Sequence, residues 1–215
     1  MTPTHTLYTA PMTCALAMHA HLHRHAVPFE LKWVARGPRR RIGTVGYAEQ
    51  NPKAKVPALR LPDGELLTEI VAILAHLDEV HGPDRSARGR RRLLEWLSFL
   101  ATEVHQAVLG PTFDPESPAG AKQDADERLL GPVLAHLQAQ LERSPTLLGD
   151  DAPSTADLYL LWAGLLLRYR WPERVEGTAL DRFDQWMLGL DYVREPVRLH
   201  RARLQARVAP ADASR

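Results

Sequence analysis

Residues 51–72, NPKAKVPALRLPDGELLTEIVA, contain the clearest local structural pattern in the chain. Ala58 to Leu61 is a short apolar run, and Pro62-Asp63-Gly64 has the composition of a tight turn. Glu65 to Leu67 then returns as a second run of strand character. Two such runs around a turn predict a β-hairpin.

The residues that flank the hairpin suit a ligand with a peptide backbone. An X-Pro bond tolerates the cis form, so Pro57 can turn the backbone and leave the amide and carbonyl of Val56 free to pair with a ligand. Leu67-Thr68-Glu69-Ile70 is expected to open a helix with a hydroxyl and a carboxylate in its first turn. Free amide hydrogens and the helix dipole favour a ligand carboxylate there, and Glu69 would face the ligand's ammonium group.

Composition excludes several classes of protein. The 215 residues can bury a substantial core and suit one large or two small domains. Lys and Arg number 27 against 26 Asp and Glu, so no long-range field favours nucleic acid or an anionic membrane as a partner. A single cysteine excludes an internal disulfide, and no signal-type segment is found, so a cytoplasmic protein is expected. The apolar run Leu158 to Leu167 is too short to span a bilayer and is expected to form a buried helix.

The N-terminal part is predicted to be a β-α-β unit that leads into the hairpin. Its elements are a strand at Thr6–Thr9, a helix from Cys14 to the break at Val27-Pro28, a strand at Phe29–Val34, a basic segment at Arg36–Gln50, the hairpin, and a helix at Glu69–Val80. The two strands of a β-α-β unit are expected to be parallel.

From Arg88 onward the periodicity is helical and no convincing strand is found. Leu93, Leu94, Trp96, Leu97, Leu100 and Val104 share one predicted face, as do Leu129, Leu130, Val133, Leu134, Leu137 and Leu141. Pro111 to Gly120 is expected to be a loop between these helices. Ser154-Thr155-Ala156-Asp157 predicts a capping box, and further helices are expected at Leu180–Leu190 and Glu195–Arg207.

Cys14 is the first candidate for chemistry. It lies in the first turn of a predicted helix, where the amides and the dipole favour the thiolate over the thiol. The alternative is a small buried apolar residue with no chemical role.

Four segments together resemble the glutathione transferases, and the bacterial, cysteine-containing beta class is the most similar. They are Y-x-x-P-x-x-C-x-L at residues 8–16, N-P-K-x-x-V-P-A-L at 51–59, D-G-x-x-L-T-E-x-x-A-I at 63–73 and E-W-L-x-F-x-A-T-E-x-H at 95–105. The resemblance covers nearly the whole chain. It implies a thioredoxin-like α/β domain (βαβαββα) at residues 1–80, a linker at 81–87, an all-α domain at 88–207 and a disordered tail at 208–215.

The resemblance also implies an activity. The protein would conjugate glutathione, its co-substrate, to a small hydrophobic electrophile, or would reduce disulfides with it, as a cytoplasmic homodimer in detoxification and without a metal. Cys14 and His105 would be catalytic, and His105 could accept the thiol proton. Val56, Pro57, Glu69, the Ile70 amide and Arg39 would bind glutathione, with a solvated charge in a basic run as the alternative for Arg39. An electrophile pocket would be walled by Phe113, Leu166 and Tyr169, with core packing as an equal alternative for these three.

Other readings of the same residues stay open. Ile70, Ser98 and Gln106 depart from the beta-class pattern, which favours a non-catalytic interaction module with the same fold. Tyr8 and Thr13 are alternative hydroxyl donors to the glutathione sulfur, although Tyr8 is expected to be a packing residue. A run of four histidines in the first helix resembles a metal-binding pattern through its spacing of four, but no carboxylate or cysteine completes it; we expect these side chains, His19, His21, His23 and His25, to be exposed.

Overall fold

The computed structural model describes residues 4–35 and 46–208. The strands are β1 (His5–Thr9), β2 (Phe29–Trp33), β3 (Ala58–Arg60) and β4 (Leu66–Thr68). The helices of the N-terminal part are α1 (Ala15–Arg24), α2 (Tyr47–Gln50) and α3 (Ile70–His81). The later helices are α4 (Ala87–Phe99), η2 (Leu100–Leu109), α5 (Gly110–Phe113), α6 (Ala119–Asp124), η3 (Ala125–Leu129), α7 (Leu130–Arg143), α8 (Thr155–Arg170), α9 (Pro172–Val175), α10 (Ala179–Leu188) and α11 (Asp191–Val208), where η marks π-helical winding.

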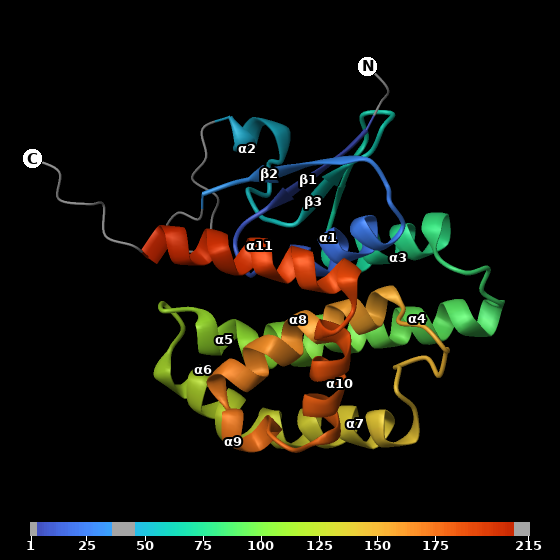
Figure 1. Ribbon diagram of the computed structural model, residues 1–215. Helices are drawn as coiled ribbons and strands as arrows, with labels where there is room; N and C mark the ends of the chain where they lie inside the picture. The colour runs from blue at the N-terminus through green and yellow to red at the C-terminus, as the bar shows by residue number, and fades with distance from the viewer. Residues whose placement is uncertain (1–3, 36–45, 209–215) are drawn as a thin grey trace, which may run out of the picture.

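The strands form one mixed sheet in the order β2-β1-β3-β4. β1 and β2 are parallel, whereas β3 is antiparallel to both β1 and β4, so the predicted β-α-β unit and hairpin are confirmed. Gly64 closes the hairpin turn with φ 95°, a conformation that glycine adopts without steric cost. Helices α1 and α3 cover the face of the sheet that looks toward the helical part, and α2 covers the other face (Figure 1).

The helical part is centred on α8, as the apolar run predicted. Every side chain from Thr155 to Gly164 is buried, and α8 packs against α1 across the boundary between the two parts. The last helix, α11, also packs along α1 (Figure 1). The thioredoxin-like sheet with a mostly helical C-terminal part is therefore the predicted fold class.

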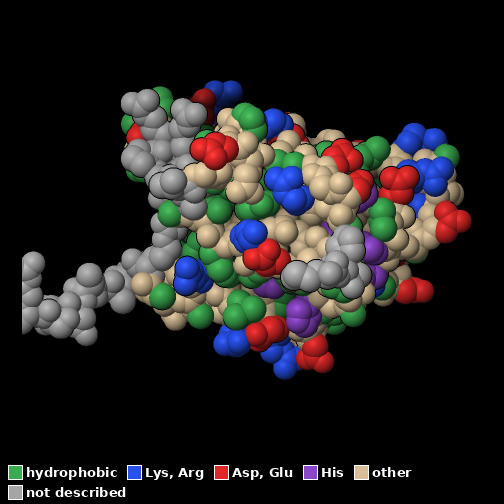
Figure 2. Space-filling view, turned by 90° about the horizontal axis from the view of Figure 1, so that it is seen from above, with side chains coloured by type: hydrophobic (Ala, Val, Ile, Leu, Met, Phe, Trp, Pro, Cys, Tyr) green, Lys and Arg blue, Asp and Glu red, His purple; other side chains and the backbone are tan. Residues whose placement is uncertain are grey.

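A buried ion-pair network ties the two parts together. Arg85 follows α3, and its side chain is 8% exposed. Its Nε lies 2.6 Å from Asp78 Oδ2, and its Nη1 lies 2.6 Å from Asp150 Oδ2 in the loop before α8. The buried charges of Arg85 and Asp78 are thus paired with each other, and Arg85 also pairs with the partly exposed Asp150. Elsewhere on the surface, acidic and basic side chains are interspersed over the face drawn in Figure 2.

The expected loop at Pro111–Gly120 is shorter than predicted. The chain stays helical through Phe113 and is helical again from Ala119, so only residues 114–118 lie outside a helix. Pro111 lies inside this stretch, because η2 runs directly into α5, whereas Pro118 is the N-cap residue of α6. The abundance of proline therefore marked helical positions as well as the loop.

Two further expectations in the helical part are corrected. The last helix begins at Asp191 rather than at Glu195, because an acidic residue suits the first turn and Pro196 is accommodated inside the helix. Leu94 is 45% exposed, since its neighbours Leu93 and Trp96 take the positions of α4 that face the core.

Candidate functional site

Cys14 is the N-cap residue of α1, directly after the turn that leaves β1. Its side chain is 4% exposed, and its carbonyl accepts the Ala17 amide at 3.1 Å. No side chain caps α1, so the positive end of the helix dipole lies beside the sulfur. Thr13 is not free to serve as a sulfur donor, because its hydroxyl donates to the Ala10 carbonyl at 2.9 Å.

His105 lies in the π-helical segment η2 and reaches α8. Its Nδ1 is 2.7 Å from the Tyr159 hydroxyl, and its ring centroid is 4.5 Å from that of Trp162. Tyr159 is fully buried, and burial together with the nearby Cys14 raises its pKa, so the hydroxyl keeps its proton at neutral pH. Tyr159 therefore interacts with both predicted catalytic residues, Cys14 and His105.

The register of the sheet brings the predicted glutathione-binding residues to the same edge. Tyr8 pairs with Ala58, and Ala58 pairs with Thr68. Both strand pairs are antiparallel, so the chain beyond Tyr8 that leads to Cys14 lies beside Val56-Pro57. The same register puts Glu69 beside Val56-Pro57 on their other side.

The Val56-Pro57 peptide bond is cis, a form that an X-Pro bond was expected to tolerate. Within the described residues, no hydrogen bond engages the Val56 amide or carbonyl. The preceding loop is shaped by two side chains, since the Lys55 carbonyl accepts from Tyr47 Oη at 2.7 Å and from Asn51 Nδ2 at 2.9 Å. No local pattern indicated these two supporting residues, although Asn51 is the first residue of the stretch 51–72.

Glu69 was expected in the first turn of a helix, but it lies just before the helix. Thr68 ends β4, and Glu69 is the N-cap of α3 with φ 71°, because the chain makes a sharp corner between the strand and the helix. The Glu69 carboxylate is exposed and already paired, with Lys53 Nζ 2.6 Å from its Oε1. Ile70 is the first helical residue, and no side chain caps the amides of α3.

The predicted electrophile-pocket residues lie at the junction of α5 and α8. Phe113 and Tyr169 stack with ring centroids 6.3 Å apart, and Leu166 is partly buried against the core. Tyr169 is 79% exposed, so one side of this aromatic pair faces solvent. Arg39 lies outside the described residues. Tyr8 packs against Tyr47, as expected, and donates its hydroxyl hydrogen to Gln50 Oε1 at 2.5 Å.

The expectation that the histidines of the first helix are exposed was wrong for two of them. His19 is 3% and His21 is 2% exposed, because α1 is covered on one side by the sheet and on another by α11. In the described part of the chain, no group of three or more His, Cys, Asp or Glu side chains is arranged to hold a metal ion. None of the helices in residues 4–35 and 46–208 has the length and apolar character needed to cross a membrane.

A surface hollow of about 310 Å³ lies elsewhere, between the C-terminal end of α7 and α10. It is lined by residues such as Leu141, Phe183 and Trp186, none of which belongs to the elements that carry the candidate site. The hollow is therefore separate from the candidate site around Cys14.

Comparison with known proteins agrees with this geometry. The profile of the glutathione S-transferase N-terminal domain matches residues 12–80. Glutathione S-transferase GstA of Escherichia coli O157:H7 is 40% identical over 194 residues, which cover 84% of this chain and 90% of that protein. A sphingomonad glutathione S-transferase complexed with glutathione is 30% identical, with a TM-score of 0.76, and the match covers 91% of this chain and 98% of that one. A bacterial beta class enzyme from Sphingomonas chungbukensis is 28% identical, with a TM-score of 0.73 and the same coverage of both chains.

The similarity extends over both the sheet and the helical part. Since the sequence identity and the fold agree along almost the entire length, the chain belongs to the glutathione S-transferase family and is a glutathione transferase-like enzyme similar to those of the bacterial beta class.

Proposed function

We propose that the protein binds glutathione along the sheet edge formed by Cys14, Val56-Pro57 and Glu69-Ile70. The observation that carries this proposal is the register, which brings three segments far apart in the sequence to one edge. The Val56 amide and carbonyl would pair with the ligand's backbone. The uncapped amides of α3, beginning at Ile70, would hold the γ-glutamyl carboxylate.

The charges at this edge support the same orientation of the ligand. Glu69 would bind the γ-glutamyl ammonium group, in exchange for part of its contact with Lys53. Both side chains are exposed, so their pairing in the free protein is weak and can be replaced by a ligand. Arg39 is proposed to bind the glycyl carboxylate, on the basis of the family resemblance.

Two reactions fit a thiol held beside Cys14. In conjugation, the glutathione thiolate forms a carbon–sulfur bond with an electrophile, and the leaving group departs with the bonding electron pair. The thiol proton would pass to His105, whose imidazole is oriented by Tyr159. Phe113, Leu166 and Tyr169 would contact the electrophile, since a stacked aromatic pair offers an apolar surface.

In disulfide reduction, the Cys14 thiolate attacks a glutathione-containing disulfide and forms a mixed disulfide with glutathione, which releases the other thiolate. A second glutathione thiolate then attacks this bond, which yields oxidised glutathione and frees Cys14. We further propose that the protein acts in the cytoplasm, in detoxification, as a homodimer. The partly exposed Leu94 on α4 supports a contact between copies there.

Calorimetric titration of the reduced protein with glutathione tests the binding site. Glu69→Ala is expected to weaken binding at least about tenfold, the loss of roughly one charge-assisted hydrogen bond. Glu65→Ala is the matched control, because Glu65 is an exposed glutamate at the opposite end of the same hairpin. Equal affinities of the Glu69→Ala and wild-type proteins would remove Glu69 from the site.

Ile70 and Ser98, which depart from the beta-class pattern, favour a second candidate, a non-catalytic module that presents this surface to a protein partner. Failure of the wild-type protein to bind millimolar glutathione would contradict the proposed site and support that module.

A further inference from the structure

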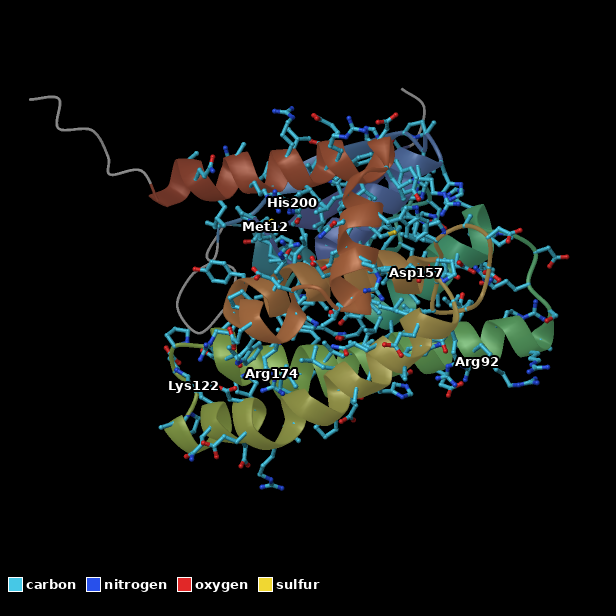
Figure 3. The ribbon with its side chains drawn as sticks, turned by 60° about the horizontal axis from the view of Figure 1, so that its bottom comes forward. Met12, Arg92, Lys122, Asp157, Arg174 and His200 are labelled. Atoms are coloured by element: carbon cyan, nitrogen blue, oxygen red, sulfur yellow. The ribbon has the colours of Figure 1, made fainter. Side chains whose placement is uncertain are left out.

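The peptide group of Met12, two residues before Cys14, is held from two sides by the helical part. Its amide donates to Nδ1 of His200 in α11 at 3.2 Å. Its carbonyl accepts from the indole Nε1 of Trp162 in α8 at 3.0 Å. Figure 3 shows Met12 and His200 next to each other at α11. Side chains 188 and 150 residues away thus engage both polar backbone atoms of a single residue in the turn.

Met12 has a backbone conformation that needs such support. Its φ is 53°, in the left-handed region that few residues other than glycine adopt. A conformation of this kind persists when surrounding contacts hold it. Because Met12 precedes Thr13 and Cys14, its dihedral angles set the direction in which the chain enters α1 and therefore the place of the sulfur.

His200 is suited to accept this hydrogen bond. It is fully buried, and burial, followed by the nearby His19, lowers its pKa to about 3, so its ring is neutral at physiological pH. An Nδ1 that accepts the Met12 amide requires the ring hydrogen to be on Nε2. That Nε2 is buried and has no hydrogen-bond partner in the described part of the protein.

The two nitrogens of the His200 ring therefore affect stability in opposite ways: Nε2 is buried without a hydrogen bond, whereas Nδ1 accepts one from Met12. Burial of an N–H group that gains no hydrogen bond costs free energy, and an apolar ring of similar size would avoid this cost. The polar contact that His200 makes in return is with the Met12 peptide. Because packing between α1 and α11 alone would favour an apolar ring, the imidazole is better explained by its hydrogen bond to the turn before Cys14.

We propose that His200 and Trp162 are positioning residues that hold the Met12 peptide and thereby keep the Cys14 sulfur at the N-terminal end of α1, beside Tyr159. The inference deepens the function proposed above, since it rests on the role of Cys14 at the sulfur of glutathione. It assigns to the last helix, α11, an influence on the reactivity of a residue at the other end of the chain.

The test compares two substitutions of His200. His200→Phe keeps an aromatic ring but removes the acceptor, whereas in His200→Asn the side-chain oxygen is as many bonds from Cα as Nδ1 is. The readouts are the pH midpoint of Cys14 ionisation, followed by thiolate ultraviolet absorbance, and the rate at which iodoacetamide alkylates the thiol with loss of iodide. The single cysteine of the chain makes both readouts specific.

We expect His200→Phe to raise the pH midpoint by about one unit and to slow alkylation at neutral pH about tenfold. His200→Asn should stay within about twofold of the wild-type rate, because it restores the acceptor. His19→Phe is the matched control: it removes another buried histidine, whose ring lies 5.5 Å from that of His200 and whose Nδ1 has no hydrogen-bond partner in the described residues, and it should leave both readouts unchanged.

Wild-type behaviour of His200→Phe would overturn the proposal, and so would equal losses in the Phe and Asn variants, which would indicate ring packing alone. Should His200→Phe fail to fold, Trp162→Phe removes the donor to the Met12 carbonyl and is expected to slow alkylation in the same direction. Neither readout requires glutathione, so a protein that fails to bind glutathione would still show whether His200 controls the thiol.

Discussion

At the scale of single residues, Tyr159 connects the two residues that the sequence singled out. His105 and Cys14 are in different parts of the chain; the buried Tyr159 hydroxyl lies 2.7 Å from the imidazole, and Cys14, after burial, contributes to the raised pKa of Tyr159. For His105 to accept the thiol proton at Nε2, the ring hydrogen must be on Nδ1, which then donates to the Tyr159 oxygen. In this arrangement Tyr159 holds the orientation of the imidazole and leaves Nε2 as the proton acceptor.

Tyr159→Phe should lower kcat/KM for conjugation about tenfold, because the imidazole loses the hydrogen bond that orients it. The substitution keeps the ring, so the free energy of unfolding should fall by only about 1 kcal/mol. Steady-state kinetics with a chromogenic electrophile measure the effect. Tyr192→Phe serves as the control, since Tyr192 is a partly buried tyrosine of α11 outside the candidate site. Unchanged kinetics of Tyr159→Phe would remove Tyr159 from the mechanism.

At the scale of the elements, a cap stabilises the N-terminal end of α8, the helix that carries Tyr159 and Trp162. The predicted capping box is present. Asp157 is fully buried, and its carboxylate accepts from the Ser154 amide at 2.7 Å, the Ser154 hydroxyl at 2.6 Å and the Leu147 amide at 2.8 Å. Burial raises the pKa of Asp157, while these hydrogen bonds act in the opposite direction. The carboxylate thus joins the loop before α8 to the helix.

Asp157→Ala should reduce the free energy of unfolding by about 3–5 kcal/mol, because it leaves buried donors without an acceptor and removes a helix cap. Urea unfolding followed by circular dichroism measures this loss. Asp151→Ala, at an exposed aspartate of the same loop, should change stability by less than about 0.5 kcal/mol. A loss below about 1 kcal/mol in Asp157→Ala would show that the loop amides find other partners.

At the scale of the whole molecule, buried histidines couple stability to pH. Burial, with smaller contributions from nearby cationic groups, lowers the pKa of His19 to about 4 and those of His21 and His200 to about 3. In the unfolded chain a histidine has a pKa near 6.5. The unfolded chain therefore binds protons first as the pH falls. The stability that comes from neutral buried rings is complete above about pH 6.5 and is lost toward pH 3–4.

When the pH falls from about 7 to about 5, each of these histidines should lower the free energy of unfolding by about 2 kcal/mol. Urea midpoints measured across this range should fall, and His21→Leu should make the fall shallower by about that amount. His136→Gln, at an exposed histidine, should leave the pH dependence as it is in the wild type. An unchanged slope in His21→Leu would indicate that the ring is hydrated and charged in the folded protein.

Local patterns predicted much of this molecule. The hairpin, the cis-compatible Val56-Pro57 bond, the capping box and the buried character of α8 depend on neighbours within a few residues, and each is present. The errors lie where local preference and tertiary contacts compete. Pro111 was interpreted as part of a loop but lies within a helical stretch, and Glu69 forms a corner before α3 instead of its first turn.

The sequence by itself determined the succession of elements and the family, because hydrophobic periodicity, turn residues and motif spacing act over short distances along the chain. It also indicated Cys14 and His105 as candidate catalytic residues. Only the tertiary structure decided that Tyr159 hydrogen-bonds to His105, and that His200 and Trp162 hold the peptide of Met12. These contacts join segments more than fifty residues apart, and such pairs are set by the packing of α8 against η2 and of α8 and α11 against α1 rather than by any local pattern.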